Sequence, residues 1–269
     1  MSADQLPALK SNPKFIFFTD FDGTITMKDS NDYLTDNLGF GPELRRKGNI
    51  EVLENRETFR DAFKEMLDSI KHPFNECVQT LVDNIKLDPH FNDFYKWALE
   101  HNVPVVVLSS GMVPIIRALL EHLVGPDAAK IQIISNDVKP RKIDGKIPED
   151  WENKEAAWEI EYHDDSSFGH DKSLAIRPYA NLPADKRPTL FYAGDGVSDL
   201  SAARETDLLF AKKGHDLVTY CEREGVPFTL FEDWNTILEN VQAIYSGKTD
   251  VKSVAAAGVE AVRHGGNKV

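Results

Sequence analysis

An apolar run at 15–18 ends in the hexapeptide DFDGTI, which puts Asp20 and Asp22 at the end of a predicted buried strand. Open α/β sheets place their chemistry at this end of their strands. One carboxylate can attack phosphorus, and a second one two residues later can protonate the leaving oxygen and then activate water. Gly23 permits a sharp turn, and Thr24 offers a hydroxyl to orient the first carboxylate. Because an isolated string of this kind is also compatible with a polar turn, later segments must decide.

A second apolar run, at 103–108, leads into Ser109, Ser110 and Gly111 and then into an apolar-periodic stretch at 113–123. This pattern predicts a strand, a hydroxyl-rich loop and a helix. Such a loop can offer a phosphate a side-chain hydroxyl and backbone N–H groups at a helix N-terminus. A plain serine N-cap explains the same residues, so the segment does not decide alone.

Two further segments carry a cation and more carboxylates. GHDKSLAI places Lys172 near the start of a short helical pattern, where it suits a phosphate or lies on a solvated surface. The run at 189–193 leads into GDGVSD, whose glycines let Asp195 point from the strand end and put Asp199 at the next helix start. A helix cap explains Asp199 but not Asp195. With Asp20 they form an oxygen-rich cluster that favours magnesium over zinc, since no Cys/His cluster competes.

The four segments DFDGTI, VVVLSSG, HDKS and GDGVSD resemble, in this order, the motifs of the haloacid dehalogenase superfamily. They span residues 15 to 199, which is most of the chain. The resemblance implies that Asp20 is the nucleophile and a metal ligand. It also implies that Asp22 is the general acid/base and a metal ligand through its backbone carbonyl.

The remaining roles that the resemblance implies concern phosphate and metal. Ser109 and Lys172 would hold the transferring phosphoryl group, Asp195 would ligate Mg²⁺, and Asp199 would anchor the metal or its waters. A phosphate monoester and these carboxylates repel one another, so the metal and Lys172 must supply positive charge before attack.

The expected fold is α/β, with a Rossmann-like parallel-sheet core and a small helical-bundle cap inserted after the first strand. Apolar residues recur at three- and four-residue spacing in 31–38, 49–67 and 74–85, which predicts helices. We expect the core to comprise 1–27 and 87–246, the cap 28–86, and a flexible tail 247–269. The resemblance implies a cap that closes over the site, although these helices could also simply extend the core. Strand-like runs at 131–138 and 158–163 predict a β excursion before Lys172.

Composition limits the kinds of partner. With 31 basic and 44 acidic residues the net charge is −13, and no basic stripe points to nucleic acid or an anionic membrane. Cys77 and Cys221 are far apart, which argues against a disulfide and for a reducing compartment. No apolar run suits a signal peptide or a bilayer span. We therefore expect a cytoplasmic protein, with a nuclear pool and a homodimer left open.

Residues of the predicted cap bear on the substrate. In phosphoserine phosphatases, an acidic residue after the first motif binds the substrate ammonium, and Asp29 falls there. A cap arginine binds the substrate carboxylate, but counting from Phe59 puts Met66 at that place, with Arg60 and Lys64 only nearby. Without a positioned guanidinium a carboxylate lacks a bidentate partner. Phosphoserine is therefore an alternative substrate, not the first choice.

The segments ITMKDSND and TFRDAFKEMLDSI look more like a neighbouring branch, which includes diketo-methylthio-phosphopentane phosphatases and phosphocholine/phosphoethanolamine phosphatases. Asp29 and Asp32 could face an ammonium or a polyol, or be solvated charges in a first helical turn. The expected function is a magnesium-dependent phosphomonoesterase that acts on a small phosphorylated metabolite through an aspartyl-phosphate on Asp20. A phosphomutase and a non-catalytic phospho-ligand sensor are the alternatives.

Overall fold

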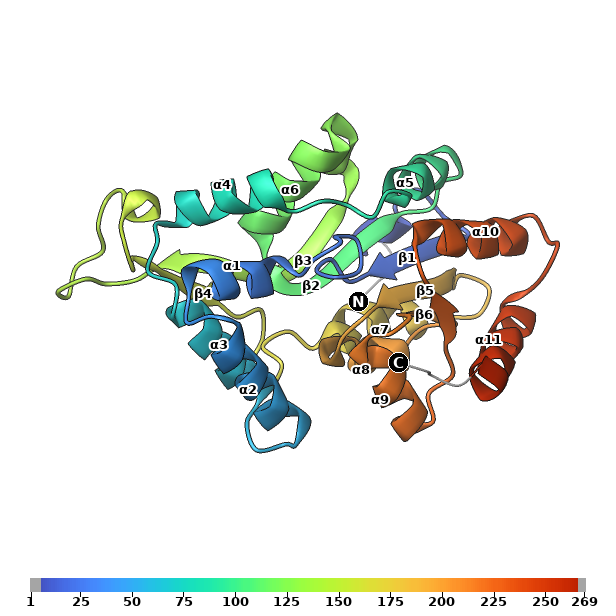
Figure 1. The fold of residues 1–269 in the computed structure, drawn as a ribbon. Coiled ribbons are helices and arrows are strands. Elements are labelled where there is room, and N and C mark those ends of the chain that lie inside the picture. Colours follow the sequence, from blue (N-terminus) through green and yellow to red (C-terminus); the bar gives the residue numbers. More distant parts are fainter. Residues whose placement is uncertain (1–5, 266–269) are drawn as a thin grey trace. The chain divides into compact units, whose positions relative to one another are not determined.

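The computed structural model describes residues 6–265, with side chains through Glu260, and its chain divides into two compact units (Figure 1). The first unit comprises Met1–Ile25, Leu87–Leu108 and Asp171–Val269. The second unit comprises Thr26–Lys86 and Ser109–His170.

The first unit is built on a parallel sheet. Its central strand β1 (Phe15–Thr19) pairs with the leading part of β2 (Val105–Met112) on one side and with β5 (Thr189–Gly194) on the other. Strands β6 (Leu208–Lys212) and β7 (Thr229–Phe231) follow β5, and all these pairs are parallel. Every residue of β1 is buried, as expected for a strand with both faces covered. The predicted α/β class with a parallel core sheet is confirmed.

Alternate residues of β1 pack on opposite faces of this sheet. The helices of the unit are α5 (Phe91–Glu100), α7 (Lys172–Ala180), α8 (Leu200–Ala203), α9 (Asp216–Glu224), α10 (Trp234–Tyr245) and α11 (Val251–Gly265). The Phe17 ring lies 4.7 Å from Phe94 of α5 and 5.5 Å from Trp234 of α10, while Phe18 lies 5.4 Å from Tyr179 of α7. Figure 1 shows α5 and α10 on one side of these strands and α7, α8 and α9 on the other.

The second unit combines helices with an antiparallel strand pair. Strand β3 (Gln132–Pro140) pairs with β4 (Trp158–Glu161), which confirms the predicted β excursion. The helices are α1 (Ser30–Leu38), α2 (Pro42–Leu53), α3 (Phe59–Asp68), α4 (Phe74–Asn84) and α6 (Val113–Val124). Within residues 6–265, short 3₁₀ turns lie at Pro7–Leu9, Pro126–Lys130, Trp151–Asn153 and Val197–Asp199.

The single helical stretch predicted at 49–67 is wrong, because the chain breaks there between α2 and α3. Asn55 adopts a left-handed conformation with φ 56°, which ends α2. Thr58 then caps α3, and its hydroxyl accepts a hydrogen bond from the Asp61 backbone N–H at 3.0 Å. No residue of α2 is buried, so apolar periodicity could not reveal the boundary.

The helices at 28–86 are fastened to the β3–β4 pair inside the second unit. The indole N–H of Trp158 donates to the His72 carbonyl at 2.9 Å, and the Ala156 N–H donates to the Lys71 carbonyl at 2.8 Å. Arg141 forms an ion pair with Asp68. The second unit thus also includes residues 109–170, which the sequence analysis assigned to the core. The moving cap at 28–86 stays a prediction.

The predicted flexible tail from 247 is wrong for residues 251–265, which form α11. Val254 is buried, and its carbonyl accepts a hydrogen bond from the Thr229 hydroxyl at 3.3 Å. Gly258 lies so close to β7 that a Cβ there would meet Thr229 Oγ1 at 2.6 Å. The alanines at 255–257 are strong helix formers. The remaining part of that prediction, 266–269, lies outside the described residues.

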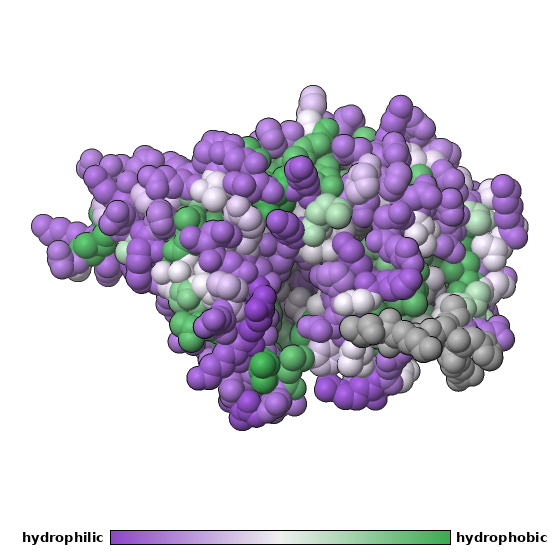
Figure 2. Space-filling view, in the orientation of Figure 1, coloured by the Kyte–Doolittle hydropathy of each residue, from purple (hydrophilic) through white to green (hydrophobic). Residues whose placement is uncertain are grey.

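The surface is mainly polar. Figure 2 shows a largely hydrophilic face with scattered apolar residues, consistent with the net charge of −13. Between residues 6 and 265, none of the helices has the length and apolar character needed to span a membrane.

Candidate active site

The loop after β1 carries two buried carboxylates in the first unit. Asp20 and Asp22 are each only 6% exposed. The Asp20 N–H donates to the Ala193 carbonyl of β5 at 2.8 Å, which fixes the start of the loop. Gly23 has φ 74°, and a Cβ there would lie 2.3 Å from Asp195 Oδ2. Only glycine therefore allows this loop to approach Asp195 so closely.

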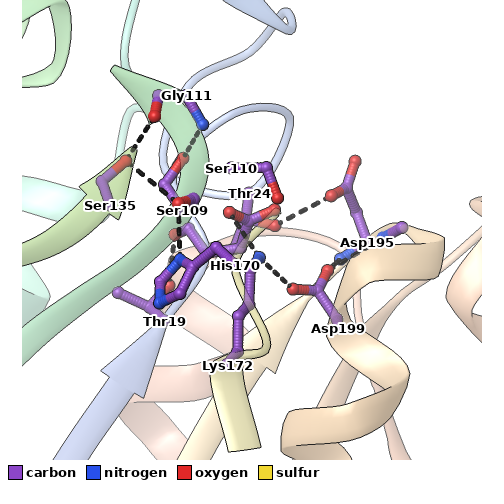
Figure 3. Close-up of polar contacts among 12 residues, drawn as sticks. Thr19, Thr24, Ser109, Ser110, Gly111, Ser135, His170, Lys172, Asp195 and Asp199 are labelled. Carbon is purple, nitrogen blue, oxygen red and sulfur yellow. Dashed lines mark hydrogen bonds and ion pairs between the residues drawn. The ribbon is translucent and has the colours of Figure 1, made fainter. Parts of the chain in front are cut away.

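Lys172 lies at the centre of this carboxylate cluster. Its fully buried ammonium is 3.0 Å from Asp20 Oδ1. It is also 2.6 Å from Asp199 Oδ1 (Figure 3). Asp171 caps the helix that begins here by accepting from the Ser173 N–H at 3.0 Å. Burial alone would lower the pKa of Lys172, but the charges of Asp199 and Asp20 raise it above its ordinary value. The solvated-surface alternative for this lysine is wrong.

Asp199 joins Lys172 to the β5 end. Its Oδ1 also accepts from the Tyr192 hydroxyl at 2.5 Å, and its Oδ2 accepts from the N–H groups of Asp195 and Gly196, each at 3.0 Å. Both oxygens are thus engaged, which suits a residue that anchors others. The sequence analysis gave Tyr192 no chemistry; the one signal was a hydroxyl in an otherwise apolar strand.

Asp195 is held by two chain segments. The Thr24 hydroxyl donates to Asp195 Oδ1 at 3.3 Å, whereas the sequence predicted that it would orient the first carboxylate. His215 Nδ1 lies 3.1 Å from Asp195 Oδ2, and the Leu217 N–H donates to the Asp195 carbonyl at 2.9 Å. The sequence analysis missed His215, because no motif marks it and it follows Asp195 by twenty residues.

The cluster of Asp20, Asp195 and Asp199 has more negative than positive charge. Asp20, Asp195 and Asp199 offer carboxylate oxygens that lie within 4.8 Å of one another, and Lys172 supplies one positive charge to them. Burial raises the pKa of Asp20 well above its ordinary value, Asp199 raises it further, and Lys172 opposes both. An all-oxygen donor set with excess negative charge fits Mg²⁺.

The predicted phosphate loop lies in the second unit, and its backbone is held by buried side chains. The Ser109 carbonyl accepts from Ser135 Oγ at 3.0 Å and from His170 Nδ1 at 2.9 Å (Figure 3). The Ser110 carbonyl accepts from Asn136 Nδ2 at 2.7 Å. Because a carbonyl can only accept, His170 must carry its proton on Nδ1. The sequence analysis missed these three supporting residues, since nothing local ties them to the loop.

The side chains of that loop differ in their surroundings. Ser109 Oγ accepts from the Gly111 N–H at 3.0 Å. Ser110 is 8% exposed, and its hydroxyl has no hydrogen-bond partner within the described part of the chain. The loop thus has the hydroxyls and the fixed backbone expected of a phosphate ligand, and this role stays a prediction.

Asp29 and Asp32 serve helix α1. Asp29 Oδ1 accepts from the N–H groups of Asn31 at 2.7 Å and Asp32 at 2.9 Å, which makes Asp29 the N-cap. Asp32 forms an ion pair with Arg45 at 2.6 Å. These contacts support the first-turn interpretation of both residues, and substrate binding by Asp29 stays a prediction.

The cap cations near the expected arginine position are engaged elsewhere. Arg60 Nη1 donates to the Asp164 carbonyl at 2.6 Å, and its guanidinium stacks 4.2 Å from the Tyr162 ring centre. Lys64 pairs with Asp68 at 2.5 Å, and Met66 is buried. Both cations thus already have partners within the protein, and neither is positioned to bind a substrate carboxylate.

Comparison with known proteins agrees with this geometry. The model of the haloacid dehalogenase-like hydrolase family matches residues 17–204. A polyol phosphate phosphatase of Saccharomyces cerevisiae, PYP1, is 50% identical over 245 residues, which is 88% of this chain and 97% of that protein. A 2-hydroxy-3-keto-5-methylthiopentenyl-1-phosphate phosphatase of Bacillus cereus is 25% identical and covers 86% of this chain and 98% of its own length.

The fold also matches a solved structure. A phosphoserine phosphatase in a phospho-aspartyl intermediate analogue form superposes with a TM-score of 0.60 at 20% identity, over 85% of this chain and 98% of that one. At this identity the match concerns the fold alone. Because the family model covers more than half of the chain and the yeast relative is half identical, the chain belongs to the haloacid dehalogenase-like hydrolases and is a phosphatase of that family.

Proposed function

We propose that this protein is a magnesium-dependent phosphomonoesterase that hydrolyses a small polyol phosphate through an aspartyl-phosphate on Asp20. The observation that carries the proposal is the buried contact of Lys172 with both Asp20 and Asp199. A lysine held in this way has its charge fixed beside the nucleophile rather than in solvent.

In the first step, an Asp20 carboxylate oxygen attacks the phosphorus of the monoester. A bond forms between that oxygen and phosphorus as the bond to the substrate alcohol breaks, and Asp22 gives its proton to the leaving oxygen. Lys172, 3.0 Å from Asp20 Oδ1, orients the nucleophile and offsets the charge of the incoming phosphate. The predicted phosphate ligands Ser109, Ser110 and Gly111 remain part of this proposal.

In the second step, Asp22, now a carboxylate, takes a proton from water. The water oxygen bonds to phosphorus, the bond to Asp20 breaks, and inorganic phosphate leaves. Asp20, Asp195 and the backbone carbonyl of Asp22 would hold Mg²⁺, with Asp199 as anchor. The ion would supply charge that offsets the repulsion between phosphate and carboxylates.

A relative and the contacts of Arg60 support the proposed substrate class. The half-identical yeast protein is named a polyol phosphate phosphatase. The Arg60 guanidinium donates to the Asp164 carbonyl and stacks on the Tyr162 ring. It would therefore not offer a bidentate contact to a substrate carboxylate. Both observations support a phosphorylated polyol over phosphoserine.

Phosphate release from a panel of monoesters tests the proposal. The panel contains glycerol phosphate, a sugar phosphate, phosphoserine, phosphocholine and an aryl phosphate, each with magnesium or EDTA. We expect turnover that needs magnesium, favours the polyol phosphates and is lost in Asp20→Asn but kept in the exposed control Asp93→Asn. Phosphoryl transfer that appears only after a sugar bisphosphate is added to the panel would indicate a mutase, and phosphate binding without any turnover would indicate a sensor; either contradicts the proposal.

A further inference from the structure

The turn at 212–217, between β6 and α9, contacts the catalytic loop and the metal-binding cluster at three points. Lys212 Nζ donates to the Gly23 carbonyl at 2.5 Å. His215 Nδ1 lies 3.1 Å from Asp195 Oδ2, and the Leu217 N–H donates to the Asp195 carbonyl at 2.9 Å. All these residues belong to the first unit.

Together with the catalytic loop, the turn surrounds the Asp195 carboxylate. The Thr24 hydroxyl lies at Oδ1 and the His215 ring at Oδ2, while Gly23 packs so closely that a Cβ would meet Oδ2 at 2.3 Å. Each carboxylate oxygen can accept more than one interaction, so these partners fix its direction and still leave acceptor capacity for a metal.

Core packing does not account for the position of His215. Its side chain is 43% exposed, so little apolar area is buried by placing the ring there. Core packing does not account for the position of Lys212 either. Burial lowers the pKa of its ammonium, yet the group donates to the Gly23 carbonyl. Lys212 and His215 are both directed at the loop and the carboxylate that the proposed reaction uses, whereas Lys213 of the same turn pairs with Glu232.

We propose that the β6–α9 turn is a positioning element for the metal site, in which His215 orients the Asp195 carboxylate toward Mg²⁺. The inference rests on the proposed magnesium-dependent function. Partners that orient a ligand in this way commonly change metal affinity by 10–100-fold when removed. His215 touches neither substrate nor metal in this account and acts only through Asp195.

Magnesium binding to the full chain, measured by isothermal titration calorimetry, tests this role directly. His215→Ala removes the ring, whereas His215→Asn keeps an N–H donor near the place of Nδ1. His90→Ala is the matched control, because His90 is 42% exposed and also faces an aspartate, Asp93 at 3.7 Å, away from the site. We expect His215→Ala to weaken magnesium binding by about 10-fold or more. His215→Asn should retain most of the affinity, and His90→Ala should match the wild type.

Two accompanying measurements separate positioning from stability. The substrate KM at saturating magnesium and the thermal unfolding midpoint in EDTA should both be unchanged in His215→Ala. Equal or tighter magnesium binding by His215→Ala overturns the inference, as does an equally weak His215→Asn or a midpoint lowered in EDTA. A wild-type protein that binds no magnesium overturns the proposed function itself, and the inference with it.

Discussion

Asp20 is a carboxylate that folding places in an unfavourable environment. It is buried beside Asp199, and its pKa is raised even though Lys172 lies 3.0 Å away. The same burial that makes it a site for a cation therefore reduces the stability of the metal-free fold.

The variant Asp20→Asn should be inactive but more stable than the wild type in EDTA at pH 7. Folding raises the pKa of Asp20 above 3.8, so folding favours its protonated form, and stability is lost as pH rises through the folded pKa. The free energy of unfolding of Asp20→Asn at pH 7 should therefore exceed that of the wild type. Thermal unfolding between pH 3 and 8 checks this: the gain should vanish below about pH 4, and a pH-independent difference would contradict it.

The variant Gly23→Ala should lose activity for a steric reason. Its Cβ would lie 2.3 Å from Asp195 Oδ2, so the carboxylate or the loop must shift. Gly247→Ala is the matched control, since Gly247 has the same φ of 74° with no atom within 4 Å of the added Cβ. In both variants the free energy of unfolding should fall by about 1–2 kcal/mol, because alanine must adopt the left-handed conformation. Only Gly23→Ala should also lose turnover, by about 100-fold, the effect of a misplacement near 1 Å.

Single residues show how far the sequence could predict the site. Asp20, Lys172 and Asp195 carry motif patterns, and the structure brings their side chains together in one unit. Tyr192 and His215 complete the same cluster, but their roles depend on which segments meet in space. A sequence pattern records local spacing, so contacts of this kind remain hidden from it.

The sequence predicted helices and strands most accurately where their residues are fully buried. Strands β1 and β5 were predicted because both faces of the sheet are covered, which leaves continuous apolar runs. The break between α2 and α3 was missed, and α2 has no buried residue, so apolar periodicity could not define it. Helix α11 was missed because its alanines carry little hydrophobic pattern, although Val254 and Gly258 pack against β7.

Arg60, in the first turn of α3, gives a prediction about that helix. Its backbone N–H donates to the Ser167 carbonyl at 2.8 Å, and its guanidinium binds the Asp164 carbonyl and the Tyr162 ring. Arg60→Met should therefore lower the unfolding midpoint and change KM for phosphoserine and for glycerol phosphate by the same factor. A KM that rose for phosphoserine alone, in assays of both substrates, would show that Arg60 recognises a carboxylate.

The two cysteines lie in the helices α4 and α9 and should be unreactive while the chain is folded. Burial raises the pKa of each thiol, Cys77 and Cys221, to about 12. At pH 8 little thiolate is present, and the thiolate is the reactive form. Titration with a thiol reagent should detect both groups only after denaturation, and fast native labelling would contradict this.

For the protein as a whole, the central claim is that hydrolysis passes through a phosphorylated Asp20. Asp22→Asn tests it most directly, because this variant can still accept a phosphoryl group from an aryl phosphate, whose leaving group needs no acid, but cannot activate water for the second step. Acid-quenched samples with magnesium would be digested and the peptide containing Asp20 analysed by mass spectrometry. We expect one aryl alcohol released per enzyme and one phosphoryl group on Asp20. A burst without that modification, or a phosphoryl group on another residue, would contradict the account.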